Sequence, residues 1–249
     1  MEAADVCFAK TELDGYGSTM IMDGEIPGTL VNYHSLPING YLDLGPCQNG
    51  ARIIFLCSGS VEFDCDGNAD KLSGRGVYVP RADKALKARA MEASGFVELI
   101  RALDPNEYVP FCAQPELPYC LEYSAAAKYT EECKSPKTIS RMLVPQRLVP
   151  RFAMGSVETH GEDMVAKHTH PMLEQYFFGL AENNCLAMID DLLLPFGGNE
   201  LLHIPLGSDH GILLHEDHCA HYIWMDFLFD EEGLEYMDSA HRLIDENEN

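Results

Sequence analysis

The stretch His168-Thr169-His170-Pro171-Met172-Leu173-Glu174 decides the interpretation of this chain. Side chains at positions i and i+2 of a β-strand point to the same face, so the two histidines share a face if this stretch is a strand. Glu174 has the same parity and joins them if the chain bends modestly at Pro171. A third imidazole, that of His210, follows the turn Pro205-Leu206-Gly207. The sequence therefore predicts one metal centre with the ligands His168, His170, Glu174 and His210.

Three neutral imidazoles and one carboxylate suit a divalent transition ion with one or two open positions, so we expect Mn, Zn, Fe or Ni as the cofactor. The ion and one carboxylate leave a net site charge of about +1, which attracts a substrate carboxylate, enolate or alkoxide and acidifies bound water. An HxH pair in a β-rich chain is also a common accident of surface polarity. The spacing of the carboxylate and of the third histidine favours a metal site over that accident.

The flanking sequence consists of short, β-type apolar runs broken by turn residues. Residues 61–65 alternate between apolar and polar, and Asp66-Gly67 predicts a hairpin turn. Many short strands at close spacing indicate a sandwich or barrel. Four prolines between 105 and 118 interrupt this rhythm, and the pattern becomes helical after Asp230. We expect an N-terminal barrel over residues 1–103, a packed proline-rich connector over 104–137, a metal-binding barrel over 138–230, and a helix with an acidic tail over 231–249.

The two barrel regions have the same layout, which indicates one β-unit used twice. The run Val77-Tyr78-Val79-Pro80 corresponds to Leu202-His203-Ile204-Pro205 in the second half. When the two prolines are aligned, Ala85 stands at the place of His210. The first barrel is therefore predicted to lack metal ligands and to serve as a structural wall or an oligomer surface.

These motifs resemble those of the cupin superfamily. The glycine–HxH–glutamate–glycine motif and the glycine–PxG–histidine motif of that family match Gly161, His168, His170, Glu174, Gly179, Gly198, Pro205, Gly207 and His210. Leu214 stands where the family has a final asparagine. The resemblance implies an all-β fold of two tandem cupin (jelly-roll β-barrel) domains with a short C-terminal helix. Among such bicupins the layout is similar to ureidoglycine aminohydrolases, although their ligand order differs, and to deoxyuronate isomerases.

Several other residues are candidates for the chemistry. Tyr176 shares the parity of the ligands and is expected to line the cavity, with core packing as the alternative. Arg151 is a candidate for bidentate binding of an anionic substrate, with a surface ion pair as the alternative. Asp226 shares parity with Trp224, and it is a candidate base if that face looks into the site.

Composition excludes several classes of partner. The formal net charge of −23, from 17 basic and 40 acidic residues, makes phosphate backbones and anionic lipids poor partners. We expect no signal peptide, no apolar run reaches membrane-spanning length, and the nine cysteines form no CxxC pair. We therefore expect reduced thiols, a cytoplasmic protein, a small-molecule substrate, no nucleic-acid or membrane partner, and a homo-oligomer, in the simplest case a homodimer.

The functional prediction is a metal-dependent enzyme that acts on a small carboxylate or hydroxy-carbonyl metabolite by isomerisation, elimination or hydrolysis. The same ligand set also serves Fe(II)-dependent dioxygenases, and a non-catalytic metabolite-binding cupin is a third possibility. Turnover under nitrogen would exclude the dioxygenase, and ligand binding without turnover at any metal would indicate a binding protein.

Overall fold

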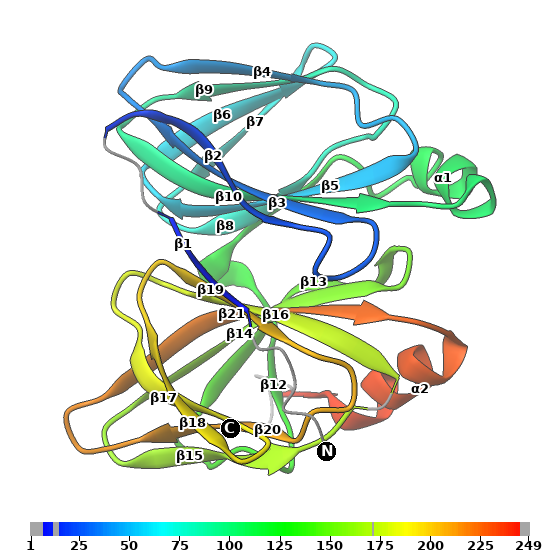
Figure 1. Cartoon of the computed structure of the whole chain (residues 1–249). Coiled ribbons are helices and arrows are strands. Elements are labelled where there is room, and N and C mark those ends of the chain that lie inside the picture. The colour runs from blue at the N-terminus through cyan, green and yellow to red at the C-terminus, as the bar shows by residue number, and fades with distance from the viewer. Residues whose placement is uncertain (1–6, 12–14, 171, 245–249) are drawn as a thin grey trace. The chain divides into compact units, whose positions relative to one another are not determined.

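A computed structural model of the chain describes residues 7–11, 15–170 and 172–244. The described residues are predominantly antiparallel β-strands, with two α-helices, and they divide into two compact units (Figure 1). The N-terminal unit consists of residues 11–126 with 148–150, and the C-terminal unit consists of residues 127–147 and 151–249 with 1–10. No helix in the described part of the chain is long and apolar enough to cross a membrane.

The N-terminal unit is a sandwich of two antiparallel sheets, with strand orders β11-β8-β5-β10-β3-β2 and β4-β9-β6-β7. Its elements are β2 (Gly17–Asp23), β3 (Thr29–Leu36), β4 (Tyr41–Gly45), β5 (Gly50–Ser58), β6 (Ser60–Cys65), β7 (Asn68–Ser73), β8 (Gly76–Val79), β9 (Leu86–Ala90), β10 (Ser94–Ala102), α1 (Pro105–Cys112), β11 (Tyr119–Glu122) and the 3-10 turn η1 (Tyr123–Ala125).

Local sequence explains the hairpin between β6 and β7. Val61, Phe63 and Cys65 are buried, whereas the intervening acidic residues are only half-buried, as the alternation predicts. Asp66 and Gly67 both have positive φ angles, which a two-residue hairpin with the right-handed strand twist requires. The turn therefore sets the register of these two strands.

The C-terminal unit has the same sandwich plan. One layer has the order β1-β19-β16-β21-β14-β13-β12-β22, and the other contains β15, β20, β17 and β18. The elements are β1 (Phe8–Lys10), β12 (Lys128–Thr130), β13 (Ile139–Val149), β14 (Phe152–His160), β15 (Asp163–His168), β16 (Leu173–Gly179), β17 (Asn184–Ile189), β18 (Leu192–Gly197), β19 (Glu200–Ile204), β20 (His210–Leu214), β21 (Cys219–Leu228), α2 (Glu231–Ala240) and β22 (Arg242–Leu243).

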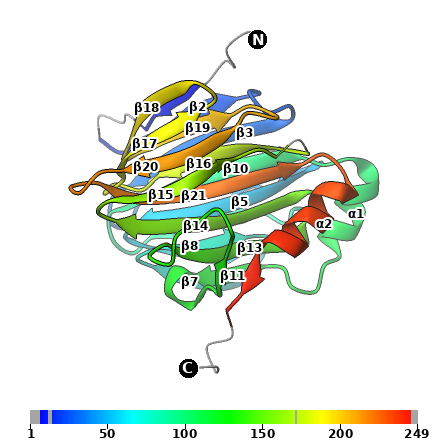
Figure 2. The same cartoon turned by 90° about the horizontal axis from the view of Figure 1, so that it is seen from below.

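Helix α2 follows β21 (Figure 2). Its residues Leu234 and Met237 pack against the core of the C-terminal unit. The Asp230 side chain begins the helix by accepting a hydrogen bond from the backbone N–H of Gly233 at 3.1 Å. The helix expected after Asp230 is therefore present, and its inner face reaches the barrel that carries the histidines.

Two segments, the N-terminal one and the proline-rich connector, are divided between the two units differently from our expectation. The sequence predicts that residues 1–103 belong to the first barrel, but Phe8–Lys10 pairs with β19 of the C-terminal unit. The proline-rich stretch 104–137 is divided, because α1 and β11 belong to the N-terminal unit and β12 belongs to the C-terminal unit. Strand pairing between residues distant in sequence, which composition does not reveal, decides both assignments.

Candidate metal centre

The three predicted histidines converge at one end of the C-terminal sandwich. His168 ends β15, and it lies opposite His210, which begins β20. His170 follows in the segment after β15, and the ring centroids are 4.6 to 5.3 Å apart. The ligand nitrogens of all three lie within 4.8 Å of one another. The antiparallel pairing of β15 with β20 thus brings the two motifs together.

Hydrogen bonds orient two of these rings. The Nδ1–H of His168 donates to the carbonyl oxygen of Ala166 at 2.9 Å, and the Nδ1–H of His210 donates to that of Ser208 at 3.0 Å. A carbonyl only accepts, so the lone pair of each ring is on Nε2, the arrangement typical of metal-binding imidazoles.

Two of the imidazoles, those of His170 and His210, are also in the right protonation state for a metal. Burial, reinforced by the neighbouring histidines, lowers the pKa of His170 to about 3. Burial and the nearby His168 lower the pKa of His210 to about 4. Within the described residues, His170 Nδ1 and His210 Nε2 are buried without a hydrogen-bond partner. Neutral, buried donors that lack partners fit a bound cation, so the chemistry of this donor set suits a divalent transition ion.

Glu174 does not join the three histidines, which corrects the predicted ligand set. Its carboxylate lies 3.5 Å from Nε2 of His203, and it is Gln175 that lines the cavity of His168 and His170. The parity argument fails because the chain leaves the strand between His168 and Leu173, where β16 begins. Parity holds only along a continuous strand, so the break moves the inward position from 174 to 175.

Gln175 presents an oxygen to the site. Its Nε2 donates to the Oδ1 of Asp226 at 2.7 Å, and its buried Oε1 has no hydrogen-bond partner in the described part of the chain. An amide oxygen is a neutral ligand for a metal ion. Three imidazole nitrogens and this oxygen are the donors that would hold an ion here.

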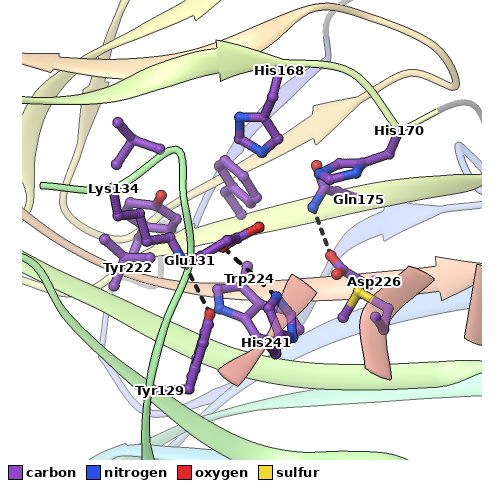
Figure 3. Close-up of a pocket in the computed structure, with 14 residues that line it drawn as sticks. Tyr129, Glu131, Lys134, His168, His170, Gln175, Tyr222, Trp224, Asp226 and His241 are labelled. Carbon is purple, nitrogen blue, oxygen red and sulfur yellow. Dashed lines mark hydrogen bonds and ion pairs between the residues drawn. The ribbon is translucent and has the colours of Figure 1, made fainter. Parts of the chain in front are cut away.

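Asp226 and Trp224, which share parity on β21, both line the same cavity (Figure 3). Burial raises the pKa of its carboxyl to about 7, although the hydrogen bond from Gln175 opposes the shift. A carboxyl with this pKa accepts or returns a proton near neutral pH, which is the property of a general base or acid.

The structure does not bring Tyr176 or Arg151 to the cavity, and both predicted roles are corrected. Tyr176 is fully buried on the opposite face of β16, where its ring packs against Phe227 and His203 with centroid distances of 5.3 and 5.6 Å. Arg151 lies in the turn between β13 and β14, with a φ angle of 52°. The break after His168 that displaces Glu174 also displaces Tyr176, since both share one parity.

Sequence reasoning missed the segment after β12, which enters the cavity (Figure 3). Nζ of Lys134 lies 2.8 Å from the Glu131 carboxylate and donates to the Tyr129 hydroxyl at 3.0 Å. His241, at the end of α2, lies 3.7 Å from the same carboxylate. The sequence contained one signal for this segment, a Glu and a Lys three residues apart. It was overlooked because the prolines indicated that the stretch is a connector.

These contacts keep the Glu131–Lys134 pair ionised. Burial alone would raise the pKa of Glu131, but the charge of Lys134 and its hydrogen bond to the carboxylate lower the pKa to about 2. Burial likewise opposes the charge of Lys134, but Tyr129 and Glu131 hold its pKa above the ordinary value. The pair is a buried dipole beside the histidines and adds no net charge.

Two cavities meet at this centre. The inner one has a volume of about 30 Å³ and contains His168, His170, Gln175 and Asp226. The outer one has a volume of about 410 Å³, and its walls include His168, Glu131 and residues of α2 and β22. Ligand sites commonly have volumes of a few hundred Å³. The outer chamber is therefore large enough for a small metabolite whose reacting end enters the inner cavity.

Comparisons with known proteins find no matching family model and no matching curated protein. Solved structures do match. A putative glyoxylate-induced protein from Pseudomonas aeruginosa has a TM-score of 0.68 at 11% identity, over 92% of this chain and 90% of that chain. An oxalate decarboxylase from Lactobacillus farciminis, solved as a formate complex, has a TM-score of 0.67 at 12% identity, over 96% and 86%. A cupin 2 conserved barrel domain protein from Leptotrichia buccalis has a TM-score of 0.60 at 12% identity, over 92% and 98%.

The chain has the cupin fold. These likenesses cover most of the chain, so both sandwiches are cupin barrels, as the sequence motifs implied. At such low identity they establish the fold alone.

Each of the two cupin barrels buries a carboxylate on the strand that precedes its helix, Glu98 on β10 and Asp226 on β21. In the C-terminal barrel Asp226 of β21 lies opposite Gln175 of β16. In the N-terminal barrel Glu98 of β10 lies opposite Ile54 of β5. The duplicated frame therefore allows a direct comparison of two buried carboxylates in one kind of scaffold.

Their surroundings differ in charge. Glu98 accepts hydrogen bonds from Arg52 at 2.7 Å, Asn32 at 2.9 Å and His34 at 3.0 Å. Burial alone would raise the pKa of Glu98, but these partners outweigh it and lower the pKa below its ordinary value. The N-terminal barrel thus neutralises its carboxylate internally, whereas the C-terminal barrel leaves Asp226 able to exchange a proton beside the three histidines.

Proposed function

We propose that this cupin is a metal-dependent enzyme that acts on a small carboxylate or hydroxy-carbonyl metabolite by isomerisation, elimination or hydrolysis. The observation that carries the proposal is the convergence of three imidazoles and the Gln175 amide oxygen on a cavity that also contains Asp226. This arrangement provides a site for a metal ion, which would act as an electrophile, and places the Asp226 carboxyl next to it as a group that exchanges protons.

The donor set supports an anionic substrate. The imidazoles and the amide are neutral, so a bound divalent ion would keep about two positive charges, one more than a centre with a carboxylate ligand. The name of one structural neighbour, an oxalate decarboxylase solved with formate, is consistent with carboxylate chemistry on this fold. The small inner cavity favours a substrate whose carboxylate or carbonyl end alone reaches the centre.

Asp226 is the residue to which we assign the proton transfer. When bound, the ion would act as a Lewis acid and stabilise enolate-like or alkoxide-like charge. Asp226 removes a proton from carbon or a hydroxyl group and returns it at another position or to water. Gln175 orients the Asp226 carboxyl by donating to Oδ1, and Asp226 in turn orients the Gln175 oxygen.

The test combines metal reconstitution with a substrate panel. Metal-free protein is loaded separately with Mn²⁺, Zn²⁺, Co²⁺ or Fe²⁺ and incubated under nitrogen with small hydroxy acids, keto acids and dicarboxylates, and products are followed by NMR. We expect turnover without oxygen by the wild type, and we expect Asp226→Asn to lower kcat by about 100-fold or more, the usual contribution of a general base.

Glu174→Gln provides the matched control, because Glu174 is a neighbouring carboxylate that does not line the cavity of the three histidines. It should retain metal content and turnover, whereas we expect His168→Ala and His210→Ala to lose turnover, because each removes an imidazole of the centre. Turnover that requires oxygen would favour a dioxygenase. Ligand binding without turnover at any metal would refute the catalytic proposal.

A further inference from the structure

A second group of metal-ligand side chains adjoins the histidine centre. Donor atoms of Glu131, Cys133 and His168 all lie within 4.8 Å of one another. The carbonyl oxygen of Cys133 accepts a hydrogen bond from the backbone N–H of Ala166 at 2.8 Å. This bond holds the segment after β12 alongside β15, two residues before His168, and so brings the thiol and the carboxylate to that imidazole.

This second group faces more open space than the first. All three of its residues line the outer chamber of about 410 Å³, whereas the inner cavity has a volume of about 30 Å³. His168 and Glu131 line both cavities and therefore stand at their junction. An ion that enters from the outer chamber meets Glu131, Cys133 and His168 before it meets His170.

The charges around the chamber select the kind of ion. Lys134 lies 2.8 Å from the Glu131 carboxylate, and Arg242 lies 3.2 Å from that of Glu132. These two ion pairs cancel, so oxygen donors alone offer little net attraction for a hard cation. A thiolate from Cys133 adds the missing negative charge and favours ions that bind sulfur and nitrogen, such as Zn²⁺ and Co²⁺, over Mg²⁺ or Ca²⁺.

We propose that Glu131, Cys133 and His168 form a second divalent-metal site, selective for thiophilic ions, that competes with the inner centre for the His168 imidazole. Nδ1 of His168 is engaged as a donor to Ala166, so only the Nε2 lone pair binds metal, and it binds one ion at a time. Binding at the outer site releases the Cys133 thiol proton to solvent. The proposal deepens the proposed function in one respect: His168 serves both sites, so the outer site is a loading position for the inner one.

The experiment titrates metal-free protein with Co²⁺ and records its absorption spectrum, because thiolate ligation gives a sulfur-to-cobalt charge-transfer band that imidazole and oxygen ligands lack. His210→Ala weakens the inner centre and keeps the outer one. We expect this variant to bind about one equivalent of Co²⁺ with the charge-transfer band, and His170→Ala to behave alike. Adding Cys133→Ser to either variant should abolish the band, and adding Glu131→Gln should weaken Co²⁺ binding about tenfold or more.

Two controls separate the outer site from other causes. Glu132→Gln changes a carboxylate of the same chamber that is outside the cluster, and it should leave the band unchanged. Cys133→Ser in the otherwise wild-type chain should keep the sulfur-free cobalt spectrum of the inner centre, which shows that the fold is intact.

The cobalt spectra test the outer site and the inner centre separately. Absence of the band in both the His210→Ala and His170→Ala variants, with native tryptophan fluorescence, overturns the outer site. Persistence of the band after Cys133→Ser also overturns it, because another cysteine would then be the ligand. The inner centre, on which the proposed function rests, would be refuted by a different result. In that case the wild type would show no Co²⁺ binding of the kind that lacks the charge-transfer band.

Discussion

Replacing Asp226 by Asn should stabilise the metal-free C-terminal barrel, and increasingly so at higher pH. The pKa of this carboxyl is about 7 in the folded chain and about 3.9 in an unfolded one. Because the folded pKa is the higher one, stability is greatest below about pH 4, falls as the pH rises from about 4 to 7, and is constant above that. Three units at 1.36 kcal/mol each correspond to a cost of up to about 4 kcal/mol above pH 7. Asn cannot ionise, and its side-chain oxygen still accepts from Gln175, so the variant escapes this cost.

The assay is urea unfolding of chelator-treated protein, followed by fluorescence. Trp224 is the single tryptophan of the chain and lines the cavity, so its emission reports this barrel. The expected gain for Asp226→Asn is about 1.5 kcal/mol at pH 5 and about 4 kcal/mol at pH 8. Asp191→Asn, on the exposed turn between β17 and β18, changes the net charge equally and serves as the control. A gain that is equal at the two pH values, or no larger than that of the control, would refute the assigned environment of Asp226.

Three further outcomes follow from particular contacts. Gly155→Ala should destabilise the C-terminal barrel by roughly 3 kcal/mol in the same fluorescence assay, because a Cβ there would lie 2.2 Å from Cζ2 of Trp224. Arg52→Met should destabilise the N-terminal barrel by about 3–5 kcal/mol, because it leaves the buried Glu98 carboxylate without its guanidinium partner. Unfolding followed by circular dichroism measures this loss, and an unshifted transition would contradict the prediction. Zn²⁺ at 100 times its Kd should raise the unfolding free energy of the C-terminal barrel by about 2.7 kcal/mol, and His168→Ala, which removes the imidazole shared by both sites, should remove this gain.

Much of the fold could be predicted from local patterns. The Asp66-Gly67 hairpin, the helix after Asp230 and the strand that ends at His168 all rest on short-range preferences, which the structure retains. The meeting of His168 with His210 was also predictable, because each belongs to a motif with a characteristic spacing. The path of the N-terminal segment was not predictable, because Phe8–Lys10 pairs with a strand about 190 residues away in sequence.

The sequence by itself determined the two-barrel β architecture and the three histidines, since strand alternation and turn chemistry are local properties. Only the tertiary structure decided that Gln175 and not Glu174 faces the centre, because a break in the strand resets the parity on which the sequence argument relied. It also decided that Glu131 and Lys134 enter the cavity and that Asp226 carries a raised pKa. Burial and charge at a site depend on segments far apart along the chain, and no local pattern records which of them will meet.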